Sequence, residues 1–208
     1  MKNRIGTESL RILIAEDDSV IVLSLKEMLQ HLGHVVAGIA RNGLEAVDKN
    51  RDLGPDLIIM DIEMPELDGI EAARIINDER PVPIVILTGF SDDTLIERAS
   101  AVKVFSYLVK PVTEEDLKPA LILAIDRFDE WQRMADELKN AQESIENKKI
   151  IDRAKWIFVE RTKCSESEAY QMIRKLSRDH NVKMVIIARL IVAIAEMFES
   201  RTNRSSVK

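Results

Sequence analysis

The sequence predicts an α/β protein whose first part is a doubly wound, five-stranded parallel sheet, followed by a long helix and a small all-α domain of three helices. Two observations predict this fold class. In the first 110 residues, five short apolar runs alternate with amphipathic helical patterns. This alternation is typical of a parallel sheet that helices cover on both faces. After residue 113 no strand pattern recurs, which indicates that the rest of the chain is helical.

The predicted strands are short apolar runs, most of which end at a polar residue. Two of them, residues 57–60 and 84–87, are apolar throughout, as expected of central strands that are covered on both faces. The strands are predicted at 11–15, 34–40, 57–60, 84–87 and 107–109, and the helices between them at 20–32, 44–52, 70–78 and 94–101.

A long helix is predicted to begin after Thr113, where the sequence Thr-Glu-Glu-Asp resembles a capping box. Apolar residues then recur every seven positions, which favours a coiled coil that pairs two copies of the chain as a homodimer through residues 117–149. The alternative is a helix that packs on its own domain and then on the tail helices, because Gln142 and Lys149 interrupt the pattern. The apolar seam consists of Leu117, Leu121, Ala124, Phe128, Trp131, Ala135, Leu138 and Ile145.

Three further helical patterns follow, near residues 150–161, 165–178 and 181–198. Ser165 and Glu168 have the spacing of a capping box at the start of the second. The third pattern is mostly apolar, which favours a packing element over a helix that reads a nucleic-acid groove. The predicted divisions of the chain are a first domain at 9–126, a helical linker at 127–136, a second domain at 137–198 and a polar tail at 199–208.

Charge is distributed unevenly along the chain. Residues 1–144 carry 16 Lys and Arg against 28 Asp and Glu, whereas residues 145–208 carry 14 against 8. A basic second part favours a polyanionic partner. The single cysteine, Cys164, excludes an internal disulfide, and three scattered histidines argue against a zinc site. No apolar run predicts a signal peptide or a membrane span, so we expect a cytoplasmic protein that does not associate with the membrane.

Polar side chains of complementary chemistry follow the predicted strands. Glu16 and Asp17 follow the first strand, Asp61 ends the third, Thr88 follows the fourth and Lys110 follows the fifth. Open α/β sheets bind ligands outside the carboxyl ends of their strands. Clustered carboxylates repel one another unless a cation intervenes, and a few carboxylates with water molecules suit Mg²⁺. A carboxylate beside Mg²⁺ can attack phosphorus, while the metal and a lysine neutralise charge on the phosphoryl group.

The segments ILIAEDD, LIIMDIEMPELDG, VILTG and YLVKP resemble the receiver domain of two-component response regulators, over about residues 10–126. The resemblance implies a flavodoxin-like sheet in the order 2-1-3-4-5, a sensor histidine kinase as partner and Mg²⁺ as cofactor. It implies that the protein is not an enzyme, apart from its own Mg-dependent phosphorylation on an aspartate. The implied site consists of the phosphoacceptor Asp61, the metal ligands Glu16, Asp17, Asp61 and the backbone carbonyl of Glu63, and the switch or phosphate-binding residues Thr88, Lys110 and Tyr107.

Two residues of this segment depart from the family pattern, and one peptide bond carries a separate prediction. Glu16 stands where aspartate is commoner, which lengthens a water-mediated contact with the metal. Lys103 stands where many receivers have a small residue, which puts the local turn in doubt. The Lys110-Pro111 bond is a candidate cis peptide that would fix the direction of the lysine.

The basic tail resembles the ANTAR output domain of AmiR/NasR-type antiterminators, over about residues 137–198. The resemblance rests on Ala154-Lys155, a Ser-x-x-x-Ala-Tyr stretch, Ile173-Arg174 and Asn181 before an apolar helix. It implies binding to RNA stem-loops in leader transcripts and transcription antitermination. Trp156 departs from the family, which has a small residue there, and could stack on a base or pack in the core. The candidate RNA-binding residues are Lys155, Arg161, Lys163, Tyr170, Arg174, Lys175, Arg178 and Lys183, although exposed lysines and arginines are usually only solvated.

Three functions remain open on the sequence. The first is a phosphorylation-controlled RNA-binding antiterminator. The second is a phosphorylation-controlled DNA-binding transcription factor, although the link between the second and third tail helices lacks the glycine typical of a helix-turn-helix. The third is a signalling adaptor whose tail binds a protein. A preference for structured RNA over duplex DNA would separate the first two, and binding to neither would favour the third.

Overall fold

The structure is a computed structural model that describes residues 9–89 and 104–205, with side chains described as far as residue 197. The chain divides into two compact units, Met1–Arg133 and Met134–Lys208. The predicted helix at 94–101 and the departure at Lys103 lie outside the described residues. No helix in the described part of the chain is long and apolar enough to cross a membrane.

Five parallel strands form the sheet of the first unit, in the order β2-β1-β3-β4-β5, which confirms the expected fold and strand order. Central strands β3 and β4 are almost wholly buried, consistent with their continuous apolar pattern. Every strand end lies within one residue of its predicted position. The strands are β1 (Arg11–Ala15), β2 (Val35–Ala40), β3 (Leu57–Asp61), β4 (Ile84–Thr88) and β5 (Ser106–Val109).

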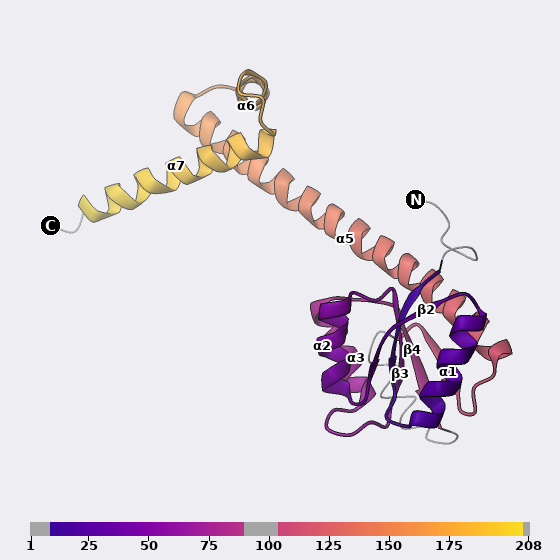
Figure 1. The fold of residues 1–208 in the computed structure, drawn as a ribbon. Coiled ribbons are helices and arrows are strands. Elements are labelled where there is room, and N and C mark those ends of the chain that lie inside the picture. The colour runs from indigo at the N-terminus through magenta and orange to yellow at the C-terminus, as the bar shows by residue number, and fades with distance from the viewer. Residues whose placement is uncertain (1–8, 90–103, 206–208) are drawn as a thin grey trace. The chain divides into compact units, whose positions relative to one another are not determined.

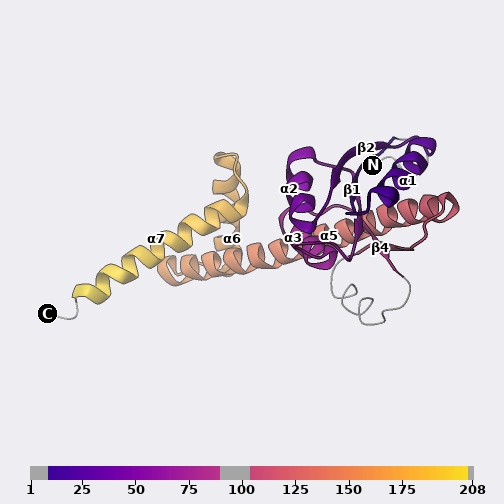
Figure 2. The same ribbon diagram turned by 60° about the horizontal axis from the view of Figure 1, so that its bottom comes forward.

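Among the described residues, two helices lie on each face of this sheet, and successive strand residues point to opposite sides (Figure 1). Ile12 and Ile14 pack with helix α1 (Ser19–His31) and with the first turns of α5 (Glu114–Thr162). Leu13 packs on the other side with α2 (Gly43–Leu53) and α3 (Gly69–Glu79). Figure 2 shows the sheet between these two layers of helices.

Three of these helices begin next to the carboxyl ends of the strands, and each has a short polar side chain at its N-cap position. Asp18, Asn42 and Asp68 each accept a hydrogen bond from a backbone N–H in the first turn of α1, α2 and α3, respectively. Those N–H groups have no partner within the helix, and replacing such a cap with alanine typically costs about 1 kcal/mol. Asp18 therefore has a local structural role that its two acidic neighbours do not share.

The apolar seam of α5 begins inside the core of the first unit. Phe128 packs edge-to-face on Phe105 with ring centroids 5.2 Å apart. The prediction that residues 117–149 form one continuous seam with a second copy is therefore wrong for its first half, where the alternative of packing on the same domain holds. The buried members of the seam are Leu117, Leu121, Ala124 and Phe128, all at most 7% exposed.

In the second unit, α6 (Glu166–Asp179) and α7 (Met184–Ser205) pack on the last turns of α5. The helix predicted at 150–161 is not separate, because it is the end of α5. Its continuity is consistent with the absence of Gly and Pro between residues 120 and 162. The small core of this unit contains Ala154, Ile173, Ile187 and Ala188.

The ends of α6 and α7 follow from particular residues. The capping box at Ser165 and Glu168 is formed, and the backbone and hydroxyl hydrogen bonds of Ser165 lower the pKa of Glu168. Asn181 has a φ of 52° in the turn before α7, a conformation that asparagine tolerates better than most residues. Helix α7 extends to Ser205, beyond its predicted end at 198.

Candidate functional site

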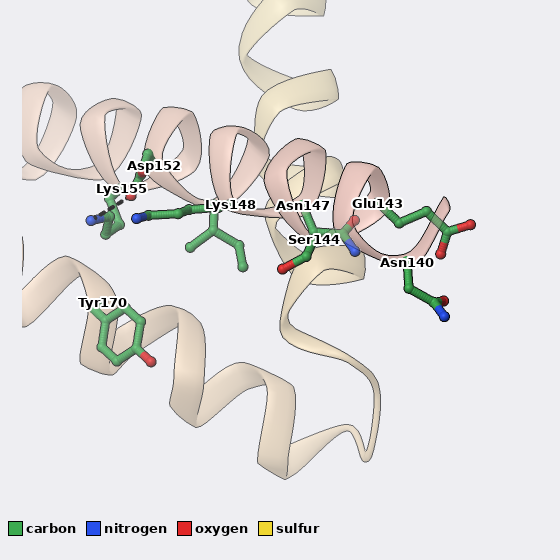
Figure 3. A pocket seen from close by; sticks show the side chains of 9 residues that line it. Asn140, Glu143, Ser144, Asn147, Lys148, Asp152, Lys155 and Tyr170 are labelled. Carbon is green, nitrogen blue, oxygen red and sulfur yellow. Dashed lines mark ion pairs between the residues drawn. The ribbon is translucent and has the colours of Figure 1, made fainter. Parts of the chain in front are cut away.

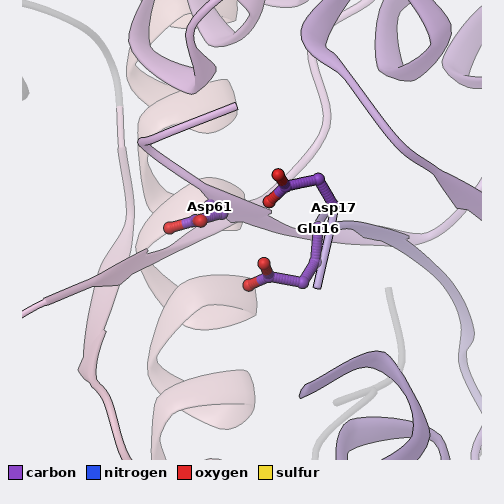
Figure 4. Close-up of side chains that lie close together, drawn as sticks. All are labelled: Glu16, Asp17 and Asp61. Carbon is purple, nitrogen blue, oxygen red and sulfur yellow. The ribbon is translucent and has the colours of Figure 1, made fainter. Parts of the chain in front are cut away.

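Three carboxylates converge at the carboxyl edge of the sheet. Glu16 and Asp17 follow β1, and Asp61 is the last residue of the adjacent β3. One oxygen of each lies within 4.8 Å of the others, and Figure 4 shows the three side chains around a shared space. Glu16 and Asp61 are buried, whereas Asp17 is exposed. This set of few carboxylates beside solvent fits Mg²⁺, which keeps part of its water shell.

Lys110 supplies positive charge to this cluster from the end of β5. Its Nζ lies 2.7 Å from Glu16 Oε2 and 2.8 Å from Asp61 Oδ2. Burial alone would lower the pKa of Lys110, but hydrogen bonds and attraction from the two carboxylates outweigh it and raise the pKa above its ordinary value. The Lys110-Pro111 peptide is cis, as predicted.

Glu16 is the most deeply buried acid of the group. Burial is the largest influence on this carboxyl and raises its pKa, while hydrogen bonds with Lys110 and the Asp18 N–H act in the opposite direction. Oε1 accepts the Asp18 N–H at 3.1 Å, and Oε2 is paired with Lys110 Nζ at 2.7 Å. Each carboxylate oxygen can accept more than one contact, which is consistent with an acidic pair that can also serve a cation or its water.

The other predicted site residues of the first unit lie at the carboxyl end of β4, on β5 and in the loop after β3. Thr88 ends β4, and its hydroxyl donates to the carbonyl of Gly89 at 3.0 Å. Tyr107 on β5 is 40% exposed, and burial of part of its ring raises its pKa. Glu63 lies exposed in the loop that follows β3.

One residue that supports this edge escaped the sequence reasoning. Arg41, after β2, donates from its guanidinium to the backbone carbonyl of Asp17 at 3.1 Å. This contact holds the acidic loop against the neighbouring strand end. No local pattern marks it, because the two residues lie 24 positions apart.

In the second unit, part of the predicted basic set lies along one face of α6. Tyr170, Arg174 and Arg178 are spaced by four residues and exposed, so they form one row along the helix, beside the face that buries Ala169 and Ile173. The remaining candidates are Lys175 on α6, Arg161 in the last turn of α5, and Lys163 and Lys183 in the links before α6 and α7.

Lys155 differs from the other basic candidates. Its Nζ pairs with Asp152 at 2.8 Å and Glu166 at 2.6 Å, and these hydrogen bonds raise its pKa. It lines a groove of about 600 Å³ between α5 and α6, with Tyr170 across from it (Figure 3). The sequence reasoning did not single out other polar residues of this groove, among them Asn140, Ser144, Asn147 and Lys148.

Comparison with known proteins divides the chain into two matched regions. The family model of the response regulator receiver domain matches residues 12–122, and that of the ANTAR domain matches residues 139–192. The transcriptional regulatory protein PdtaR of Mycobacterium tuberculosis is 39% identical over 182 residues, which cover 88% of this chain and 89% of PdtaR. The transcriptional regulatory protein LnrK of Bacillus subtilis is 29% identical over 157 residues, covering 69% of this chain and 71% of LnrK.

Solved structures agree with the receiver match. The signal receiver domain of a modulated diguanylate cyclase from Desulfovibrio desulfuricans has a TM-score of 0.56 at 34% identity, covering 59% of this chain and 98% of that one. The response regulator domain of Thermotoga maritima CheB has a TM-score of 0.51 at 30% identity, covering 58% and 96%. Because one relative matches nearly its full length and both family models match in order, this chain belongs to the response regulators that carry an N-terminal receiver domain and a C-terminal ANTAR domain.

Proposed function

We propose that a sensor histidine kinase phosphorylates this chain on Asp61 and that phosphorylation controls an RNA-binding transcription antiterminator. The observation that carries the proposal is the arrangement around Asp61. A carboxylate at the open edge of the sheet lies within ion-pair distance of Lys110 and beside the acidic pair Glu16 and Asp17. Three carboxylates that lie together at a partly open edge repel one another, so their arrangement does not serve to stabilise the fold.

Asp61 would act as the nucleophile in phosphoryl transfer. One of its oxygens forms the new bond to phosphorus while the bond from phosphorus to the donor nitrogen of the kinase's phosphohistidine breaks. Glu16, Asp17, Asp61 and the backbone carbonyl of Glu63 would hold Mg²⁺, which when bound supplies positive charge to the phosphoryl oxygens. Lys110, already at Asp61, would neutralise charge on the same group.

Thr88 and Tyr107 would report phosphorylation to the rest of the receiver. The Thr88 hydroxyl donates to the neighbouring Gly89 carbonyl, a local bond that it can exchange for a phosphoryl oxygen. Tyr107 is 40% exposed and lies on β5, next to the strand that carries Thr88. An inward turn of this ring would reshape the surface formed by β4 and β5.

The second unit would bind RNA stem-loops in leader transcripts. Cationic contacts to phosphate and stacking on unpaired bases are the usual means of recognising RNA loops. The exposed face of α6 that carries Tyr170, Arg174 and Arg178 combines both kinds of group. The ANTAR match over this unit and the similarity to PdtaR, a transcriptional regulatory protein, support an output at the level of transcription.

A gel-shift titration with the full chain tests the proposal. The probes are a two-hairpin RNA library and a duplex DNA of matched length, with Mg²⁺ and with or without a small phosphodonor. We expect RNA binding that tightens after phosphodonor treatment in the wild type and does not change in Asp61→Asn. Binding to duplex DNA alone would instead identify a transcription factor, and binding to neither nucleic acid would identify an adaptor for a protein partner.

A further inference from the structure

Three residues at the passage from β2 to α2, here called the β2–α2 junction, contact both loops of the carboxylate cluster. They are Arg41, Asn42 and Gly43. The guanidinium of Arg41 donates to the backbone carbonyl of Asp17, in the loop after β1, at 3.1 Å. The other two residues contact the loop after β3, which contains Glu63, whose backbone carbonyl is a proposed metal ligand. The junction therefore links the two sides of the proposed Mg²⁺ site.

The loop after β3 meets the junction through one side-chain contact and one backbone contact. The side-chain amide of Asn42 donates to Glu66 Oε1 at 2.9 Å, a contact here called the Asn42–Glu66 latch. The N–H of Gly43 donates to the carbonyl of Leu67 at 3.1 Å. A Cβ at position 43 would lie 2.3 Å from that carbonyl oxygen, so a larger residue would push the loop away.

The latch has features that helix capping does not explain. Asn42 is 8% exposed, and its Oδ1 caps α2 by accepting the Glu45 N–H at 2.7 Å. Aspartate or serine would cap equally well, so capping accounts for the oxygen of Asn42 but not for its amide group. Glu66 has a φ of 67°, a left-handed conformation that residues other than Gly, Asn and Asp adopt rarely. An unusual backbone conformation held by a specific hydrogen bond indicates that the position of this loop matters.

We propose that the Asn42–Glu66 latch fixes the loop that carries Glu63, which makes Asn42 and Glu66 positioning residues for Mg²⁺. This inference rests on the metal site of the proposed function. Glu63 lies between two points of attachment, because the Ile62 carbonyl accepts the Gly69 N–H at 2.9 Å and the latch holds Glu66. Without the latch, Mg²⁺ has to order the Glu63 carbonyl as it binds, and this ordering lowers the affinity.

Substitutions of Asn42 that preserve the cap separate the latch from the stability of α2. Asn42→Ser and Asn42→Asp each retain an oxygen that caps the helix, and each removes the amide that bonds to Glu66. In an NMR titration of the full chain with Mg²⁺ and no phosphodonor, both variants should bind Mg²⁺ about tenfold more weakly than the wild type. The negative charge added in Asn42→Asp would by itself tighten Mg²⁺ binding, so weaker binding there cannot come from charge.

An exchange of the two latch groups provides the matched control. In the double variant Asn42→Asp/Glu66→Gln, the new amide can donate to the new carboxylate, which restores the latch in the reverse direction. The pair keeps its net charge of the wild type. We expect this double variant to recover most of the Mg²⁺ affinity that Asn42→Asp loses, with circular dichroism to verify that all variants fold.

The possible failures can be told apart. Unchanged Mg²⁺ affinity in both single variants would overturn the latch and leave the metal site and phosphoacceptor of the proposed function in place. Weaker binding that the double variant does not recover would also overturn it, because the loss would then not depend on the pair. A wild type that binds no Mg²⁺ would refute the proposed metal site itself, and the latch with it.

Phosphoryl incorporation gives a second readout. Loss of the latch should raise the Mg²⁺ concentration at which incorporation is half-maximal and leave the rate at saturating Mg²⁺ near that of the wild type, because Asp61 and Lys110 are unchanged. A lower saturated rate with an unchanged Mg²⁺ requirement would contradict a role in positioning the metal.

Discussion

The Nζ atom of Lys110 lies 2.8 Å from Asp61 Oδ2, so the proposed phosphoacceptor is ion-paired before a phosphoryl group arrives. The same ammonium group is 2.7 Å from Glu16 Oε2. Lys110 therefore offsets the repulsion between two buried carboxylates in the resting chain. On phosphorylation it would exchange a carboxylate oxygen for phosphoryl oxygens without leaving the site.

Asp61→Asn should abolish phosphoryl incorporation from a small phosphodonor, because an amide is not a nucleophile under these conditions. The measurement is acid-labile phosphate, or intact mass, after treatment with Mg²⁺ and phosphodonor. Asp18→Asn is the matched control, since asparagine also caps helices well and the Asp18 carboxylate accepts its hydrogen bonds from the first turn of α1. Undiminished incorporation in Asp61→Asn would place the phosphoacceptor elsewhere.

Lys110→Met should destabilise the chain by about 2 kcal/mol without Mg²⁺, because Glu16 and Asp61 then lack their shared cation. The side chain of Lys110 is 21% exposed, so water softens the loss. Mg²⁺ binds the folded acidic cluster and so should raise the free energy of unfolding. The increase should be larger in Lys110→Met, because in the wild type Lys110 already pairs with Glu16 and Asp61. Urea denaturation with and without Mg²⁺ measures both effects. Equal Mg²⁺ stabilisation of the two proteins would argue against a shared carboxylate site.

The sheet could be predicted closely from the sequence because each strand is an apolar run that ends at a polar residue. The run ending at Asp61 is buried along its whole length, and this fixes both the strand and the depth of the carboxylate. The convergence of Glu16, Asp17 and Asp61 then follows from parallel strands that end at one edge. The contact of Arg41 with the Asp17 carbonyl could not be predicted, because it joins residues on neighbouring strand ends without any local pattern.

The long helix shows where periodicity alone falls short. A seven-residue repeat shows which side chains of α5 share a face, but it does not show what that face meets. Phe128 meets Phe105 of the same chain, whereas Leu138, further along the repeat, is exposed. Likewise, the apolar pattern of α7 indicates a packing element. The structure buries Ile187 but leaves Ile186 and Leu190 about half exposed.

Gly69→Ala should destabilise the receiver by about 1–3 kcal/mol and slow phosphoryl incorporation. A Cβ at this position would overlap the backbone carbonyl oxygen of Asp61, so α3 or the end of β3 would have to shift. Urea denaturation measures the first effect and the phosphodonor assay measures the second. For stability, Gly89→Ala is the control, because a Cβ there would meet none of the described atoms within 4 Å. Equal stability of the two variants would contradict the close approach at Gly69.

The ion pair between His31 and Glu114 should make receiver stability depend on pH. The imidazole Nδ1 lies 2.7 Å from Glu114 Oε2, and this hydrogen bond raises the pKa of His31. The resulting stabilisation is present in full below the ordinary histidine pKa of 6.5 and is lost as the pH rises through the raised value. The loss of stability in Glu114→Gln should therefore be larger at about pH 5.5 than at about pH 9.

Glu115→Gln is the control for that measurement, because Glu115 also lies in the first turn of α5. Both substitutions remove an acidic group that favours a helix N-terminus, an effect that does not change over this pH range. The pH-dependent part should thus appear only in Glu114→Gln. The same pH dependence in both variants would show that His31 does not contribute through Glu114.

Arg174→Ala should weaken RNA binding more than Lys155→Ala does, although both residues belong to the predicted basic set. Arg174 is exposed on the face of α6 that also carries Tyr170. The ammonium group of Lys155 already contacts two carboxylates, and its side chain is only 15% exposed. A phosphate would therefore have to displace Asp152 and Glu166 before it could bind Lys155, which offsets most of the attraction.

The measurement is the RNA dissociation constant as a function of salt. Each lost phosphate contact should reduce the slope of log affinity against log salt by about one unit. We expect this reduction in Arg174→Ala and little change in Lys155→Ala, with circular dichroism to verify that both variants fold. If Lys155→Ala instead shows the larger loss of affinity and of slope, its ion pairs must open on binding. The RNA would then enter the groove between α5 and α6, where Lys155 and Tyr170 lie, and Arg174 would not be a main contact.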